Sequence, residues 1–198
     1  MTGERIMHLQ RTESQYRLID LSLFAIILIV FESVIVKAAT AWFPMEAWTV
    51  SAAAAVTAIV MARWGLWGAI HAVIGGIVTV LVSKGAPAQF VIYGIGNLGG
   101  LAGWLLLRKY GWERLHTGFL FLMAYGGVTL LGMQAGRGLI SLLFGTTPAA
   151  VPGFITTDVI SYIFTGVILW ITARLDGMLE DQGHYLKRIN TKQEGENP

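Results

Sequence analysis

The sequence predicts an all-α integral membrane protein, folded as one domain over residues 1–198 and built as a bundle of six transmembrane helices. Three observations lead to this prediction. The chain is 55% hydrophobic and 13% charged, whereas about a quarter of the residues in a soluble domain are charged. Apolar runs of membrane-spanning length recur along the chain. The cations stand between these runs, in the tails and short connections.

The predicted spans follow from length, because a helix needs about 20 apolar residues to cross the roughly 30 Å hydrocarbon core of a bilayer. The second run is the shortest, and the turn expected at 65–68 after Arg63 marks its end. A hairpin or a tilted helix is the alternative for this run. The six spans are 17–37, 48–63, 65–83, 88–107, 117–143 and 155–174, with polar tails at 1–16 and 175–198.

Lys and Arg in the connections predict the orientation, because cytoplasmic loops carry an excess of these residues. The first, third and fifth connections hold only Lys37 and Lys84, whereas the tails and the other connections hold most of the cations. Both termini are therefore expected in the cytoplasm. The cations on that side are Arg5, Arg11, Arg17, Arg63, Arg108, Lys109, Arg114, Arg174, Lys187 and Arg188.

Polar side chains within the spans lie toward the predicted outer side of the membrane. Gln89, Tyr93 and Asn97 are four residues apart and share one helix face. Arg137 lies twenty residues after Thr117, about 30 Å along a helix, which puts it near the outer surface. Because a charge facing lipid is costly, the intramembrane charges should face protein or water.

Two interpretations of these polar groups stay open. An ion pair between Arg137 and Asp158 would satisfy two charges on two helices. A water-accessible ligand cavity would account for polar groups at matching depth on four helices. The outer loop 40–48 could cover such a cavity with its aromatic residues, although interfacial anchoring also uses tryptophan. The candidate ligand-binding residues are Glu32, Trp42, Trp48, Gln89, Tyr93, Asn97, Gln134, Arg137, Asp158 and Tyr162.

Small residues at a spacing of four suggest close helix packing, since they let helix backbones approach in lipid. Ala54, Ala58 and Ala62 form an alanine ladder along one face of the second span. Internal packing and a flat docking face for a partner subunit both explain this ladder.

No recognisable catalytic chemistry stands out in the chain. It lacks HExxH, GxSxG and Walker-type motifs, and without cysteine it has no thiolate nucleophile or cysteine metal ligand. We expect no catalytic residue, metal, cofactor or nucleic-acid partner. A lipid-modifying enzyme is the weaker alternative, since a solvated tail face better explains its candidate residues Asp176, Glu180, Asp181 and His184.

The chain resembles the substrate-binding S components of energy-coupling factor (ECF) vitamin transporters, which are small six-helix membrane proteins. The resemblance rests on the alanine ladder, on the stretch RWGLWGAI that begins at Arg63 and leads to Gly75 and Gly76, and on the polar outer halves of the last three spans.

This resemblance implies a non-enzymatic subunit in a bacterial-type cell membrane that binds a vitamin or related micronutrient in an outward-facing pocket. It would dock through its small-residue ladder on a transmembrane coupling subunit driven by two ATPase subunits. Arg137 would pair with a ligand carboxylate or phosphate, and aromatic side chains would stack on a ring. The alternative is a non-catalytic membrane scaffold of a cell-envelope or cell-shape complex.

Overall fold

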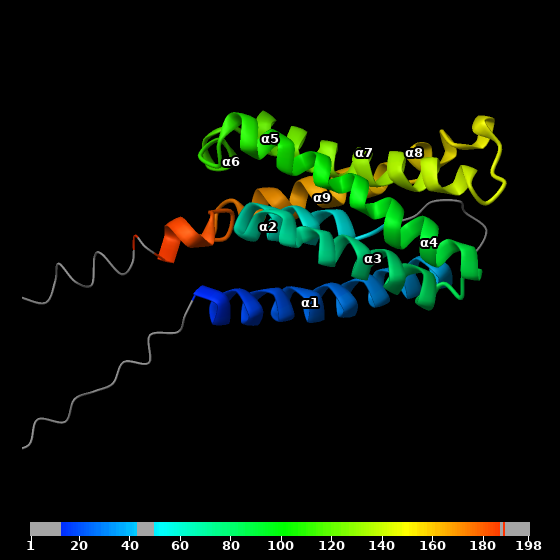
Figure 1. Cartoon of the computed structure of the whole chain (residues 1–198), viewed down its shortest axis with the longest axis horizontal. Helices are drawn as coiled ribbons and strands as arrows, with labels where there is room; N and C mark the ends of the chain where they lie inside the picture. The colour runs from blue at the N-terminus through cyan, green and yellow to red at the C-terminus, as the bar shows by residue number, and fades with distance from the viewer. Residues whose placement is uncertain (1–12, 43–49, 187, 189–198) are drawn as a thin grey trace, which may run out of the picture.

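The computed structural model describes residues 13–42, 50–186 and 188, and within them all regular structure is helical. Figure 1 shows the helices as a bundle with α1 along one side. The elements are α1 (Glu13–Trp42), α2 (Ala53–Trp64), η1 (Gly65–Trp67), α3 (Gly68–Val82), α4 (Pro87–Gly96), η2 (Asn97–Leu101), α5 (Ala102–Tyr110), α6 (Arg114–Thr117), α7 (Phe119–Leu142), η3 (Pro148–Ala150), α8 (Gly153–Thr156) and α9 (Val159–Thr172).

The described helices confirm a membrane-type, all-helical chain. By length and composition, four helical runs could cross a membrane. A fifth is added if Pro148–Thr156 and Val159–Thr172, which meet at an angle of 41°, form one broken span. The predicted count of six is not confirmed, and neither is the cytoplasmic side of the termini.

The second and third predicted spans correspond to α2 and α3, which η1 joins without a gap over Ala53–Val82. The chain reverses direction between these two helices. Gly65 has φ +61°, a conformation that glycine adopts without steric cost. A side chain on Gly75 would touch the Cβ atom of Ala53, although these residues would lie about 33 Å apart along a straight helix. The turn predicted at 65–68 is therefore confirmed, and α2 and α3 form a helical hairpin.

Glycines bring the run from α4 to α5 against α7. A Cβ atom on Gly99 would meet the carbonyl oxygen of Gly132, and one on Gly96 would meet the backbone of Arg137. The two runs are antiparallel, since Gly103 lies at Thr129. Such backbone approach is how small residues join helices in lipid, where apolar side chains gain little by leaving lipid.

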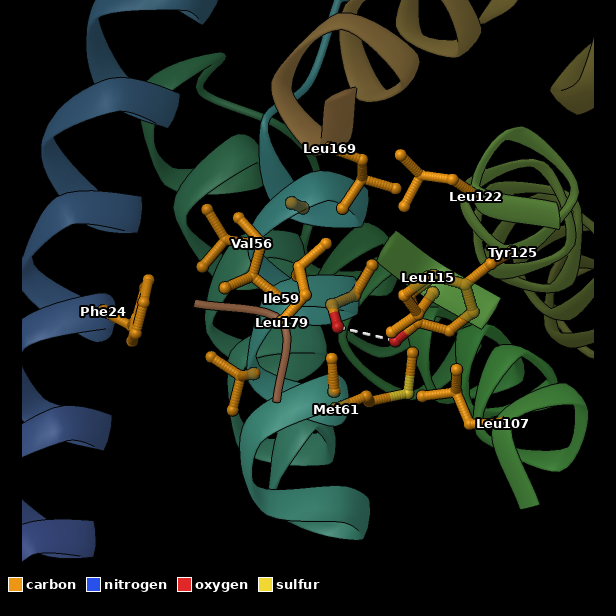
Figure 2. Packing of buried hydrophobic residues seen from close by; sticks show 14 of the residues in the cluster. Phe24, Val56, Ile59, Met61, Leu107, Leu115, Leu122, Tyr125, Leu169 and Leu179 are labelled. Carbon is orange, nitrogen blue, oxygen red and sulfur yellow. Dashed lines mark hydrogen bonds between the residues drawn. The ribbon is translucent and has the colours of Figure 1, made fainter. Parts of the chain in front are cut away.

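Helix α2 is the centre of the bundle. Every residue from Ala53 to Ala62 is buried, and α1, α3, α5, α7 and α9 all pack against it. Figure 2 shows the core formed by side chains such as Ile59 and Met61 with Leu107, Leu169 and Tyr125. The Tyr125 hydroxyl donates to the carbonyl oxygen of Ala58 at 2.6 Å. At 12 residues, α2 is about 18 Å long, shorter than the hydrocarbon core.

The described chain begins and ends at the same end of the bundle (Figure 1). We call this the Arg63 end, because Arg63 joins its parts. The Arg63 guanidinium pairs with Asp20 of α1 at 2.7 Å and donates to the carbonyl oxygen of Gly177 at 2.8 Å. Leu179 is fully buried in the main core. Part of the segment expected as a polar cytoplasmic tail thus packs into the bundle at this end.

Candidate functional site

Arg137 is the centre of a buried polar network at the opposite end, which we call the Glu32 end. Its Nε atom donates to Asn97 Oδ1 at 2.6 Å, and its Nη1 atom pairs with Asp158 Oδ2 at 3.1 Å. Asn97 Nδ2 donates in turn to the carbonyl oxygen of Ala72. The guanidinium lies 4.7 Å from the ring centroid of Tyr93. These contacts tie η2, α3, α4 and α7 to the start of α9.

The α8–α9 break places Asp158 in this network. Asp158 precedes α9 with φ −105°, outside the helical region, so its carboxylate lies where the chain bends rather than along a straight helix. Its Oδ1 atom accepts a hydrogen bond from the hydroxyl of Ser161 at 3.1 Å. The ion pair that the sequence left open is therefore present, and it is nearly inaccessible to solvent.

The start of α2 supplies a second part of the network. No α2 side chain caps this helix, and the first backbone N–H groups of a helix need acceptors from elsewhere. The N–H of Ser51 donates to Ser161 Oγ at 3.1 Å. The N–H of Ala52 donates to Glu32 Oε2 at 2.7 Å, and the N–H of Ala53 donates to Ser51 Oγ at 3.1 Å.

These acceptors explain why polar residues of several helices meet at this depth. Because α2 begins inside the bundle, water cannot satisfy its first N–H groups, and an unpaired buried N–H is costly. Glu32 of α1 is fully buried and is also bonded by the Thr79 hydroxyl of α3 at 2.7 Å. Ser51 and Thr79 were missed from the sequence, since no periodic pattern links them to Glu32.

Gln134 and Tyr162 form a further contact between α7 and α9. The Tyr162 hydroxyl donates to Gln134 Oε1 at 2.8 Å. Gln134 is fully buried, and its Nε2 atom has no hydrogen-bond partner in the described part of the chain. A buried amide nitrogen normally has an acceptor, and for this atom the described part of the chain supplies none.

The predicted face of Gln89, Tyr93 and Asn97 divides in the structure. Asn97 is fully buried and bonded to Arg137, and Tyr93 packs on the same guanidinium. Gln89 instead accepts the N–H of Ala86 at 2.9 Å through its own side chain and so caps the start of α4. Within the described residues, the Gln89 side chain has this hydrogen bond and none to Arg137 or Asn97.

The two tryptophans of the predicted outer loop cannot be joined to the site. Trp42, at the end of α1, is 75% exposed and has no described contact with Arg137 or Gln134. Trp48 lies outside the described residues. The loop expected to cover the site is likewise outside them over residues 43–49.

The alanine ladder lies inside the bundle and not on its surface. Ala54, Ala58 and Ala62 are at most 1% exposed, because α2 is surrounded by other helices. The carbonyl oxygen of Ala62 accepts the indole N–H of Trp112 at 2.6 Å. Because the ladder is buried, it cannot form the exposed docking face that was expected. In the structure it packs against the other helices of the bundle.

Comparisons with known proteins add no family to this description: no family model, curated protein or solved structure matches the chain. Within the described residues, no group of three or more histidine and acidic side chains could hold a metal ion.

Proposed function

We propose that the chain is the substrate-binding membrane subunit of an ECF-type importer, which captures a vitamin or related micronutrient at the Glu32 end without catalysing a reaction. The proposal rests on the resemblance described above and on the gathering of polar side chains from five helices at one end. A coupling subunit and two ATPase subunits would complete the importer in a bacterial cell membrane.

The proposed topology has six segments with both termini in the cytoplasm. The α2–α3 hairpin supports six alternating segments, and the cations near the Arg63 end support a cytoplasmic position for that end. Because the alanine ladder is buried, the coupling subunit would have to dock on another surface of the bundle.

The unpartnered Nε2 atom of Gln134 is the observation that favours a ligand most. The other polar groups of the network have internal partners and need no ligand to explain them. Gln134 lies one helical turn from Arg137 on α7, and its partner Tyr162 is only partly buried. A ligand acceptor atom at Nε2 would supply the missing hydrogen bond, beside the Tyr162 hydroxyl that donates to Gln134 Oε1.

Mass spectrometry of small molecules retained by the purified full chain tests the proposal. We expect a micronutrient to remain bound to the wild type and its retention to fall roughly 5- to 150-fold in Gln134→Leu, since a lost hydrogen bond to a buried group costs about 1–3 kcal/mol. Arg63→Ala is the matched control at the opposite end. It removes a partly buried charge without touching the Glu32 end.

The absence of any bound or binding micronutrient would exclude the importer function. Equal retention by wild type and by both Gln134→Leu and Arg137→Ala would keep the binding function. It would exclude the Glu32 end as the binding site.

A non-catalytic scaffold of the cell envelope is the second candidate function. The observation that favours it is the internal pairing of Glu32, Arg137 and Asp158, which explains the buried charges as supports for α2. Affinity purification from membranes separates the two functions. Recovery of ATPase subunits supports transport, and recovery of envelope-synthesis proteins supports a scaffold.

A further inference from the structure

The connection between α5 and α6 gathers cations around one aromatic ring. Lys109 Nζ lies 5.0 Å from the ring centroid of Tyr110, and the guanidinium carbon of Arg114 lies 5.5 Å from the same centroid. Arg108 lies over the neighbouring Trp104 ring at 5.5 Å. We call Lys109, Tyr110 and Arg114 the Tyr110 cluster.

The backbone under this cluster is anchored to the bundle core. Leu107 and Leu115, on either side of the turn, are at most 1% exposed. Between them, Trp112 donates its indole N–H to the carbonyl oxygen of Ala62 at 2.6 Å. Gly111 takes φ +86°, which reverses the chain after α5. The backbone that carries the two cations is therefore fixed by buried contacts, while both side chains are exposed. Binding of a ligand between them then requires ordering of these two side chains and not of the turn.

The charge of this turn is not balanced by described carboxylates. Arg63 and Arg188 have carboxylate partners in ion pairs, but the described structure contains no ion pair to Lys109 or Arg114. Glu113, the one acidic residue between them in sequence, is exposed. The end of helix α5 and the Tyr110 ring each stabilise a cation modestly, and neither neutralises its charge.

Apolar side chains border the cluster. The Tyr110 ring is 42% exposed and makes an edge contact with Phe121 at 5.9 Å between centroids. Two residues that closely precede Phe121 at the start of α7, Phe119 and Leu120, are 59% and 81% exposed. Cations beside exposed apolar side chains match an amphiphile, with an anionic group on one side and hydrocarbon on the other.

We propose that the Tyr110 cluster is a discrete binding site for an anionic phospholipid. Its headgroup phosphate binds between Lys109 and Arg114, and its acyl chains lie along Phe119 and Leu120. The site is independent of the ligand proposed at the Glu32 end. A general cationic surface would behave differently from such a site. It would lose the same amount of bound anionic lipid on the removal of any two cations near this end.

Native mass spectrometry of the full chain in detergent tests the proposal with phosphatidylglycerol and phosphatidylcholine of identical acyl chains. We expect retention of phosphatidylglycerol over phosphatidylcholine and a loss of about thirtyfold in Lys109→Ala/Arg114→Ala, since each cation near an anionic lipid contributes about 1 kcal/mol. The matched control is Arg17→Ala/Arg174→Ala. These two cations lie over aromatic rings as well, those of Trp67 and Trp170, at 4.9 Å and 4.2 Å from the ring centroids. Retention of phosphatidylglycerol by this control variant should fall less than threefold.

Equal binding of the two lipids, or an equal loss in both double variants, would overturn the proposal. Displacement of the lipid by millimolar glycerol phosphate would also overturn it, since the site would then bind the phosphate without the lipid. Lys109→Arg/Arg114→Lys keeps both charges and should retain the lipid. If that variant loses it while its unfolding midpoint is unchanged, charge does not hold the headgroup.

Discussion

The carboxylate of Glu32 accepts the backbone N–H of Ala52 at 2.7 Å, so that an acidic residue of α1 caps the first turn of α2. Capping usually comes from a residue adjacent in sequence. Here the acceptor lies 20 residues away, because α2 begins inside the bundle and its end is covered by other helices. The buried acid therefore supports the central helix of the fold.

Glu32→Ala should lower the free energy of unfolding by about 1–3 kcal/mol, since it leaves the N–H of Ala52 and the hydroxyl of Thr79 without this acceptor. Glu32→Gln keeps an acceptor oxygen and should lose less. Denaturant unfolding in detergent, followed by tryptophan fluorescence, measures the change. Lys37→Ala, at an exposed position of α1, is the control and should stay within about 0.5 kcal/mol of wild type. An equal loss in both alanine variants would refute the capping role.

Asp158→Ala should cost about 3–5 kcal/mol, because it leaves the Arg137 guanidinium buried without its carboxylate partner. Adding Arg137→Met should restore part of that loss, since the double variant has no unpaired buried charge at this position. A double-mutant cycle on unfolding free energies measures the coupling between the two residues. Strictly additive losses would show that the pair does not act as a unit.

Gly99→Ala should destabilise the chain by about 1–3 kcal/mol, because its Cβ atom would collide with the backbone of Gly132 and force α4–α5 away from α7. Gly127→Ala is a matched control within α7, since nothing lies within 4 Å of its added Cβ. It should be neutral or stabilising by up to about 1 kcal/mol, because alanine favours helix over glycine. Thermal unfolding of the two variants compares them directly, and a reversed order would contradict the packing of these runs.

Cysteines introduced as Ala53→Cys and Gly75→Cys should cross-link on oxidation, because the hairpin brings the two Cβ atoms closer than the about 3.8 Å of a disulfide. The two helices then need to separate only slightly for the bond to form. The chain has no natural cysteine, so any disulfide must join the introduced pair. Gel mobility with and without reductant measures the product. Ala53→Cys/Gly127→Cys is the control pair, and it should stay reduced. Failure of the first pair to oxidise while the chain stays folded would contradict the close approach of α2 and α3 at these two positions.

The sequence predicted some features of the network because they are local. Arg137, Asp158 and Asn97 could be named as buried polar groups, since each stands in an apolar run where exposure to lipid is costly. Their partners could not all be named. The contact between Glu32 and Ala52 involves a backbone group, and residue type says nothing about which backbone donors begin inside the bundle.

The alanine ladder also shows what the sequence could not determine. Spacing alone identifies Ala54, Ala58 and Ala62 as a smooth helix face. Such a face can pack against a helix of the same chain or against a partner subunit. The structure decides between them by surrounding α2 on all sides. A shared helix face also groups Gln89 with Tyr93 and Asn97, yet the Gln89 side chain caps the first turn of α4. Spacing does not specify which residues of one face bond to a neighbouring helix.

The sequence by itself determined the membrane class, the helical fold and the turn at 65–68, because these follow from apolar length and from glycine. Tertiary structure alone decided that α2 is central, that Arg137 is paired with Asp158 and that the segment containing Leu179 closes the Arg63 end. Those features depend on which helix faces meet. Hydropathy cannot specify this, since in lipid an apolar face is equally suited to a neighbouring helix and to the membrane.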